Sequence, residues 1–219
     1  MKKKQYAVIG VGRFGTSVAT TLSKAGHEVL VVDSNHDRIQ KLSDSFTHAV
    51  VADTTDENVL KSLGIRNFDI VIVAIGHDVQ ASVLTVLLLK EIGVPYIIAK
   101  ADSVLHGRML EKIGADRVVF PERDMGRRIG HNLLSANVID YFELAPDLGI
   151  IEVEVPAKLV TSNLVEADLR SKYGITVIAI RRKDKLLLSP DPMEKFMPED
   201  KLILVGDSLG IQRFEDAHS

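Results

Sequence analysis

The sequence predicts an α/β protein in which a doubly wound parallel sheet is followed by a second, smaller α+β domain. Three observations predict this fold. Strand-like and helix-like patterns alternate from the start of the chain to Pro121, a glycine-rich turn follows the first apolar strand, and the pattern changes near Asn137 to half-exposed strands. The length of 219 residues suits one domain of ordinary size and one smaller domain.

The first strand, turn and helix organise the first domain. Residues 6–9 predict a short buried strand, and Gly10, Gly12 and Gly15 follow at the G-x-G-x-x-G spacing before a helical pattern. At this spacing Gly10 permits a tight turn, Gly12 lets the backbone approach a phosphate, and Gly15 lets the helix pack against the strand. The helix N-terminus offers free N–H groups and a partial positive charge to an anion.

An acidic residue follows at the position where a nucleotide site needs one. Residues 28–33 predict a second strand that ends in Asp33, 18 residues after Gly15. An acid at the tip of this strand can accept hydrogen bonds from ribose hydroxyls. Strand, glycine turn, helix and acid together favour a nucleotide site over an ordinary turn with a capping aspartate.

The remaining elements of the first domain follow in alternation. Further strands are predicted at residues 49–52, 69–76, 96–100 and 117–120. Helices are predicted at residues 37–44, 56–63, 78–91 and 103–113. Six strands with helical crossovers make a complete, Rossmann-like doubly wound sheet, and the near-continuous apolar run at 70–75 suits a parallel sheet covered on both faces.

A helix from Pro121 to about Ser135 links the two domains. Ile129, Leu133 and Leu134 give it an apolar stripe that needs a covering surface. That surface is a dimer partner, the next domain or the helix's own sheet, and the sequence leaves these three open. The predicted boundaries are 1–121 for the nucleotide-binding domain, 122–136 for the linking helix and 137–219 for the smaller α+β domain.

The second domain is predicted to run strand–helix–strand–strand–strand–helix. The strands are expected at residues 150–156, 176–181, 185–189 and 201–206, and the first helix at residues 164–173, closed by Gly174. Proline-rich turns lie at residues 190–192 and 198–200.

Composition excludes several classes of function. The net charge of -3, from 27 basic and 30 acidic residues, gives no general attraction to nucleic acid or to an anionic membrane. The absence of cysteine excludes disulfides, thiolate metal sites and thiol catalysis. The start of the chain carries no apolar signal segment, and no apolar run approaches the ~18 residues of a membrane span. We therefore expect a cytoplasmic protein.

Arg13 helps to choose among nucleotides. It directly follows Gly12, where its guanidinium can bind a terminal phosphate bidentately. Asp33 would repel the additional ribose phosphate of NADP. Arg13 and Asp33 together favour ATP or ADP as the ligand, or NAD if the Arg13 side chain turns to solvent. The alternative that Arg13 is only a surface charge stays open.

Polar residues recur at successive strand ends, the edge at which open α/β sheets bind ligands. Glu122, after the sixth strand, could meet a cation beside the phosphates. A capping or solvated role is an alternative for each residue. The candidate nucleotide-binding residues are Gly10, Val11, Gly12, Arg13, Phe14, Gly15, Asp33, Ser34, Asn35, Asp53, Thr54, Ile75, Gly76, His77, Lys100, Ala101, Asp102, His106 and Glu122.

No catalytic set accompanies the candidate site. The sequence has no G-x-S-x-G, no H-E-x-x-H and no Walker lysine motif, and its seven histidines are scattered. A nucleotide-sensing binding protein is favoured over an enzyme. The alternative is an NAD(H)-dependent oxidoreductase or a redox sensor. A DNA-binding factor is disfavoured because a basic helix-turn-helix is missing and the net charge is negative.

The sequence resembles the RCK, or KTN, cytosolic regulatory subunits of bacterial Ktr/Trk-type potassium-uptake systems. The resemblance covers nearly the whole chain and is closest to the Ktr subunits. The Arg-Phe that follows the second glycine and the Pro-Glu-x-Asp-Met-Gly run are its most specific parts. The matching stretches are residues 7–15, 72–76, 110–117, 121–126 and 172–174.

The resemblance implies a nucleotide-gated regulatory subunit. Its first domain would bind ATP or ADP, or NAD(H) as in some members, with Arg13 at the γ-phosphate and Asp33 at the ribose. Lys100, His106 and Glu122 would complete the site, with Glu122 near Mg²⁺ or another cation at a dimer interface. Residues 122–136 would form the crossover helix that makes contacts between subunits. Homodimers would assemble into an octameric ring on a membrane potassium-transporter subunit, which places the protein peripherally at the cell membrane.

The resemblance also implies a second ligand. The smaller domain is similar to those that bind cyclic di-AMP at a dimer interface. The candidate residues in this domain are Arg170 and Pro190.

Overall fold

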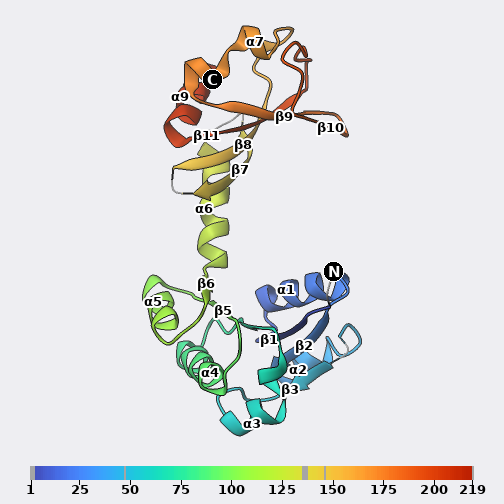
Figure 1. Cartoon of the computed structure of the whole chain (residues 1–219), viewed down its shortest axis with the longest axis vertical. Coiled ribbons are helices and arrows are strands. Elements are labelled where there is room, and N and C mark those ends of the chain that lie inside the picture. The colour runs from blue at the N-terminus through green and yellow to red at the C-terminus, as the bar shows by residue number, and fades with distance from the viewer. Residues whose placement is uncertain (1–2, 47, 135–137, 146, 219) are drawn as a thin grey trace. The chain divides into compact units, whose positions relative to one another are not determined.

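The computed structural model describes residues 3–46, 48–134, 138–145 and 147–218. The chain divides into two compact units, Met1–Glu122 and Arg123–Ser219 (Figure 1). Within the described residues, no helix is long and apolar enough to cross a membrane.

The first unit is built on a six-stranded parallel sheet. Its strands are β1 (Gln5–Ile9), β2 (Glu28–Asp33), β3 (His48–Val51), β4 (Ile70–Val73), β5 (Ile97–Lys100) and β6 (Arg117–Val119). They pair in the order β3-β2-β1-β4-β5-β6, which confirms the predicted doubly wound sheet. Ile9 lies in register with Val32 on one side and with Val73 on the other. The carboxyl ends of the three central strands therefore lie at one level.

Helices connect the strands of this sheet. They are α1 (Arg13–Lys24), α2 (His36–Gln40), α3 (Glu57–Ser62), the 3₁₀ helix η1 (Ile65–Asn67), α4 (Val79–Ile92) and α5 (Val104–Lys112). Four of them begin at a polar residue whose side chain accepts a hydrogen bond from a first-turn N–H. These N-caps are Asn35, Asp56, Asp78 and Ser103. The predicted helix at 37–44 is shorter than expected, because α2 ends at Gln40 and turns replace it from Lys41 onward.

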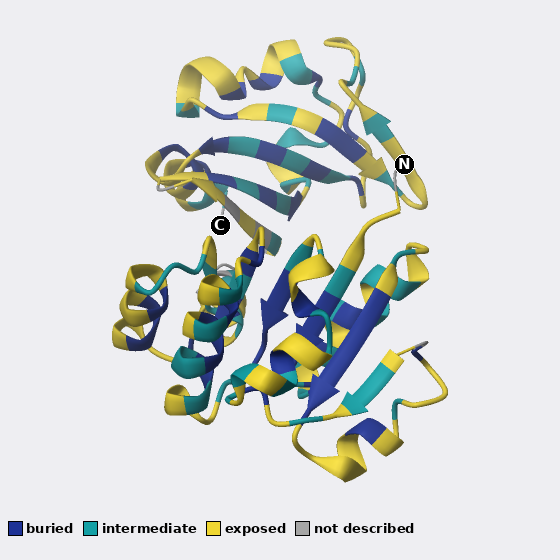
Figure 2. Ribbon diagram, turned by 60° about the horizontal axis from the view of Figure 1, so that its bottom comes forward, coloured by how far each residue is buried: buried dark blue, intermediate teal, exposed yellow. Residues whose placement is uncertain are grey.

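The sheet of the first unit has a hydrophobic core on each face. On β1, Ala7 and Ile9 belong to one cluster, whereas Val8 belongs to the other. Alternate residues of a strand point to opposite faces, so a strand buried on both faces must be apolar throughout. Figure 2 shows this pattern as strands coloured dark blue beneath helices with exposed outer faces.

The helix α6 (Pro121–Leu134) carries an uncovered apolar stripe. Met125 and Ile129 are half exposed, and Leu133 is 81% exposed. The side chain of Leu134, the predicted end at Ser135 and the predicted boundary at Asn137 lie outside the described residues.

The second unit contains a five-stranded antiparallel sheet. Its strands are β7 (Val138–Ala145), β8 (Leu148–Glu154), β9 (Thr176–Arg182), β10 (Lys185–Leu188) and β11 (Lys201–Asp207), in the order β10-β9-β11-β8-β7. The remaining elements are η2 (Ala157–Leu159), α7 (Leu164–Ala167), α8 (Leu169–Tyr173) and α9 (Ser208–His218). The smaller α+β domain is thus confirmed as a fold class.

Two details of the second unit differ from the sequence prediction. The strand β7 was missed, because its apolar residues fall on both faces and give no clean alternation. The single helix predicted at 164–173 is two helices. Asp168, which has a left-handed φ of 46°, separates α7 from α8.

Candidate nucleotide-binding site

A cavity of about 860 Å³ opens at the carboxyl ends of the parallel strands in the first unit. This is the edge at which an open α/β sheet binds its ligand. The predicted residues that line it are Gly10, Val11, Gly12, Arg13, Phe14, Asp33, Ser34, Asp53, Thr54, Ile75, Gly76, His77, Lys100 and Glu122. One cavity therefore joins turns that are distant in the sequence.

The glycine turn presents bare backbone to this cavity. Gly10 has a φ of +91°, which favours glycine, and its N–H donates to the carbonyl of Val32 at 2.7 Å. Gly12 is the N-cap of α1 and has no side chain to cap the helix. No atom lies within 4 Å of the place where a Cβ on Gly12 would be. The N-terminus of α1 is thus open to an anion.

Gly15 has a packing role instead. It is buried in the first turns of α1 and does not line the cavity. A Cβ at this position would overlap the carbonyl oxygen of Gly10. The third glycine therefore permits the close approach of helix and strand that the sequence predicts.

The carboxylate of Asp33 is held by backbone donors. It is only 7% exposed and accepts hydrogen bonds from the N–H of Val11 at 2.8 Å and of Asn35 at 2.9 Å. Arg38 Nη1 lies 3.4 Å from the same carboxylate. A carboxylate has about four acceptor sites, so Asp33 keeps capacity for a ribose hydroxyl.

At the other end of the cavity Lys100 and Glu122 form an ion pair. Lys100 Nζ lies 2.7 Å from Glu122 Oε1 and 3.5 Å from Asp102 Oδ1. The hydrogen bond from Lys100 holds the pKa of Glu122 below its ordinary value, and the charge of Arg13 acts in the same direction. Burial lowers the pKa of Lys100, but the hydrogen bonds and charges of Glu122 and Asp102 outweigh it and raise that pKa.

His106 is buried and does not line the cavity. It is 1% exposed, and its Nδ1 accepts a 3.4 Å hydrogen bond from the N–H of Asp102. Burial lowers its pKa, against the charge of Asp102, so the ring is neutral near pH 7. Its Nε2 has no partner among the described residues. Within this chain His106 supports the turn that carries Asp102.

Three other candidates also lie outside the cavity lining. Asn35 caps α2 by accepting a hydrogen bond from Arg38 N, and Ala101 is buried. Asp102 sits behind Lys100 and Gly76. The sequence placed these residues correctly at strand ends, but position at an edge does not determine which side chains face a ligand.

Several cavity residues were missed by the sequence analysis. Arg38 is the most significant, because it brings a guanidinium to Asp33 from the first turn of α2. Its spacing of five residues after the strand-end acid was an available signal. The missed lining residues are Ile9, Thr16, Arg38, Ala52, Thr55, Ala74, Asp78 and Ala81.

The two candidates of the second unit lie in neighbouring segments. Arg170 is exposed on α8, and Pro190 is half buried in the loop after β10. The N–H of Val165 on α7 donates to Pro192 at 3.4 Å, which places this loop beside the helical segment that leads to Arg170.

The fold and the cavity define a two-domain protein with a nucleotide-binding Rossmann-type sheet and no catalytic constellation in its described cavity. In the part of the chain that is described, no group of three or more His, Cys, Asp or Glu side chains could hold a metal. The TrkA-N domain family matches residues 6–121, and the TrkA-C domain family matches residues 148–219.

Curated relatives match the chain over nearly its full length. Ktr system potassium uptake protein C of Bacillus subtilis is 48% identical over 213 residues, which cover 97% of this chain and 96% of that protein. Ktr system potassium uptake protein A of the same organism is 46% identical, covering 99% of this chain and 97% of that protein.

Solved structures share the fold. The GsuK RCK domain matches all of this chain and 48% of its own with a TM-score of 0.70 at 20% identity. The GsuK channel bound to NAD covers 95% of this chain and 38% of its own, with a TM-score of 0.68 at 20% identity. GsuK bound to ADP covers 57% of this chain and 33% of its own, with a TM-score of 0.51 at 24% identity.

The chain belongs to the KtrA/KtrC type of RCK proteins, the regulatory subunits of Ktr potassium-uptake systems. It is therefore a non-enzymatic subunit of a system with a membrane transporter partner. The alternative of an oxidoreductase is wrong.

Proposed function

We propose that this subunit senses ATP and ADP in the cavity of its first domain and gates potassium transport according to which of them is bound. The observation that carries the proposal is the order of groups across the sheet edge. Asp33 stands at the end of β2, the open glycine turn and Arg13 follow β1, and Lys100 with Glu122 lies beyond. That order suits a ribose, a chain of phosphates and a cation in turn.

Arg13 supports recognition of a terminal phosphate. It is the first residue of α1 and is exposed at the cavity, where its charge acts on Glu122. A guanidinium at a helix N-terminus adds bidentate donors to the helix's own N–H groups. ATP offers this group a γ-phosphate, whereas ADP does not. Arg13 is therefore the residue through which the two nucleotides would differ.

Glu122 supports a cation beside the phosphates. Its carboxylate is ionised at pH 7, since even the ordinary glutamate pKa lies well below 7 and the hydrogen bond from Lys100 lowers that pKa, and its side chain is 69% exposed. Mg²⁺ is commonly held by one or two carboxylates together with phosphate oxygens, so a single protein carboxylate fits that ion. A cation bound to Glu122 would neutralise phosphate charge. It would compete with Lys100 for this carboxylate.

NAD(H) is a further ligand of the same cavity. The GsuK structures contain NAD in one case and ADP in another, on the same fold. Asp33 would hold the adenosine ribose in either. A dinucleotide has no terminal phosphate for Arg13, so we expect NAD(H) to bind without that contact.

Assembly of the subunits into a ring would couple the identity of the bound nucleotide to opening or closing of the potassium transporter. We propose dimers joined through the crossover helix, arranged in an octameric ring on the membrane transporter subunit, which keeps the protein at the cytoplasmic side of the membrane. The domain division at 1–121, 122–136 and 137–219 is part of this proposal. A ligand shifts such a ring only if its affinity differs between two ring shapes.

Cyclic di-AMP is proposed as a ligand of the second domain. Family membership supports it, and Arg170 offers an exposed guanidinium on α8, the helix that follows the segment in contact with the loop of Pro190. An Arg170→Ala variant should bind cyclic di-AMP more weakly in calorimetry, whereas Arg213→Ala on α9 should not. Equal affinity in both variants would remove Arg170 from the site.

Calorimetry with the full-length protein tests the first-domain proposal. ATP, ADP and NADH are titrated into the wild type, Arg13→Ala and the control Arg66→Ala, which changes an arginine of η1 outside the cavity lining. We expect Arg13→Ala to weaken ATP more than ADP and to leave NADH unchanged. NADH binding far tighter than ATP, with no effect of Arg13→Ala, would overturn the proposal.

A further inference from the structure

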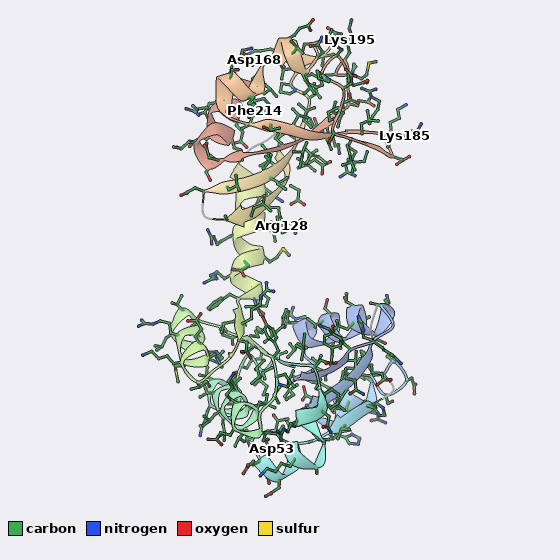
Figure 3. The ribbon with its side chains drawn as sticks, viewed as in Figure 1. Asp53, Arg128, Asp168, Lys185, Lys195 and Phe214 are labelled. Carbon is green, nitrogen blue, oxygen red and sulfur yellow. The ribbon has the colours of Figure 1, made fainter. Side chains whose placement is uncertain are left out.

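The loop after β3 and the N-terminal end of α4 form two parts of the cavity wall. Residues 52–55 of the loop line the cavity, and Figure 3 labels Asp53 among them. The end of α4 lines the same cavity through Asp78 and Ala81. A ligand in the cavity therefore meets the loop and α4 together.

Hydrogen bonds hold the loop at both of its ends. The N–H of Ala52 donates to the carbonyl of Asp33 on β2 at 3.1 Å. Asp53 Oδ1 accepts hydrogen bonds from the N–H of Thr55 at 2.9 Å and from the Thr55 hydroxyl at 2.7 Å. These bonds do not involve Thr54, so the orientation of Thr54 depends on a contact outside the loop.

That contact is a pair of buried hydroxyl groups. Thr54 is 5% exposed, and Thr85 on α4 is fully buried. The Thr85 hydroxyl donates to the Thr54 carbonyl at 3.3 Å, and the two hydroxyl oxygens lie 3.0 Å apart. Because a hydroxyl has one proton to donate, the Thr54 hydroxyl donates in turn to Thr85 Oγ1. One side chain of α4 thus fixes both the side chain and the carbonyl of Thr54.

The rest of this face of α4 needs no polar partner in the loop. Val86 and Leu89 are apolar members of the core cluster. Ser82, one turn before Thr85, is fully buried, and its Oγ has no partner among the described residues. Apolar groups of the same shape can replace a buried hydrogen-bonded pair at almost no cost in stability. Stability alone therefore gives no reason for a hydroxyl at position 85, whereas a fixed orientation of Thr54 does.

We propose that Thr85 is a positioning residue of the nucleotide site, although it does not line the cavity. The inference rests on the proposed function. The Thr85 hydroxyl holds Thr54, and with it the wall formed by residues 52–55, in the shape that a nucleotide meets. A wall that is already ordered reduces the entropy lost on binding, so it raises affinity without touching the ligand.

Substitutions at position 85 separate the effect of the hydroxyl from that of packing. Thr85→Ser keeps the hydroxyl and loses a methyl group, Thr85→Val keeps the volume without the hydroxyl, and Thr85→Ala loses both. ATP is titrated by calorimetry into the full chain of each variant, and urea unfolding is measured in parallel. We expect ATP affinity to fall roughly five- to tenfold in Thr85→Val and Thr85→Ala, and by less than about twofold in Thr85→Ser. Stability should follow volume instead, so that Thr85→Ser unfolds at a lower urea concentration than the wild type.

The matched control is Ser82→Ala, which removes a buried hydroxyl that has no hydrogen bond to the loop and should leave ATP affinity unchanged. Amide hydrogen exchange of the ligand-free protein gives a second readout. Exchange at residues 53–55 should rise several-fold in Thr85→Val but not in Ser82→Ala.

The outcomes distinguish this inference from the proposed function. If ATP fails to bind the wild type, the proposed function is wrong. If ATP binds the wild type and Thr85→Val equally well, only the role of Thr85 is wrong. The same holds if Thr85→Ser weakens ATP as much as Thr85→Val, because affinity would then follow packing rather than the hydroxyl.

Discussion

Lys100 Nζ lies 2.7 Å from Glu122 Oε1, which joins the end of β5 to the first turn of α6. The ammonium rests against Gly76, where a Cβ would lie only 2.9 Å from it. Residues at three neighbouring strand ends thus meet: the ammonium of Lys100 on β5 lies between Gly76 after β4 and Glu122 after β6. Because Lys100 Nζ lies within hydrogen-bond distance of Glu122, a cation that binds this carboxylate must compete with Lys100.

Replacing Lys100 with methionine should flatten the acid dependence of stability. The pKa of Glu122 is lowered in the folded state, so the pair stabilises above the ordinary carboxyl value of 4.5 and this stability is lost as pH falls through the lower folded pKa. Because Glu122 is largely exposed, the effect is at most about 1 kcal/mol. Urea unfolding of the wild type, Lys100→Met and the exposed control Lys24→Met between pH 3 and 7 measures it. Parallel pH profiles for all three proteins would contradict the prediction.

Replacing two glycines of the motif with alanine should affect different properties, ligand affinity at Gly12 and stability at Gly15. Gly12→Ala has open space and a φ of -69°, so the free energy of unfolding should change by less than about 1 kcal/mol, while ATP affinity falls. Gly15→Ala overlaps the Gly10 carbonyl and should destabilise by about 2 kcal/mol or more. Urea unfolding and calorimetry separate the two effects. Equal destabilisation by both would refute the assigned roles.

The buried carboxylate of Asp200 should be essential to the second domain. It is 1% exposed, accepts hydrogen bonds from Arg182 at 2.9 and 2.8 Å, and accepts another from Met197 N at 2.8 Å. Asp200→Ala removes two hydrogen bonds of the guanidinium, which keeps Glu194 and the Lys195 carbonyl, and it leaves the N–H of Met197 unpaired, so we expect a loss of about 2 kcal/mol. Thermal unfolding tests this, with the exposed Asp184→Ala as control.

Acid should also weaken the second domain through Asp200. Burial raises the pKa of this carboxyl, but the hydrogen bonds from Arg182 and Met197 outweigh burial and lower it below 3.8. Its stabilisation is therefore present above that pH and is lost as the pH falls through the folded pKa. In Asp200→Ala this acid-dependent part should be absent.

Arg128 should tether α6 to β7. Its guanidinium makes a bidentate ion pair with Asp140 (Arg128 is labelled in Figure 3). Asn132 donates a further hydrogen bond of 3.2 Å to the same carboxylate. Arg128→Met should increase amide hydrogen exchange in β7 several-fold, since the strand lies at the edge of its sheet. Exchange unchanged in β7 would show that the strand is held by its pairing with β8 alone.

Most of the fold was predicted because strand burial and helix capping depend on residues that lie close together in the sequence. Burial of β1 on both faces required an apolar run, and capping residues such as Asp78 and Ser103 marked helix starts. The strand β7 had no such signal, because Ile139, Phe142 and Leu144 are exposed in this chain although apolar. Because the apolar residues of β7 do not alternate with polar ones on a single buried face, the alternation expected of a strand could not identify it.

The parallel sheet, the glycine turn and Asp33 follow from short stretches of sequence, because glycine conformation and strand burial are local constraints. The convergence of particular strand-end residues depends on how distant segments pack. Lys100 meets Glu122 across 22 positions, while His106, on the adjoining helix, turns inward. Strand register and helix packing set such distances, and neither is encoded in the spacing of residues along one segment.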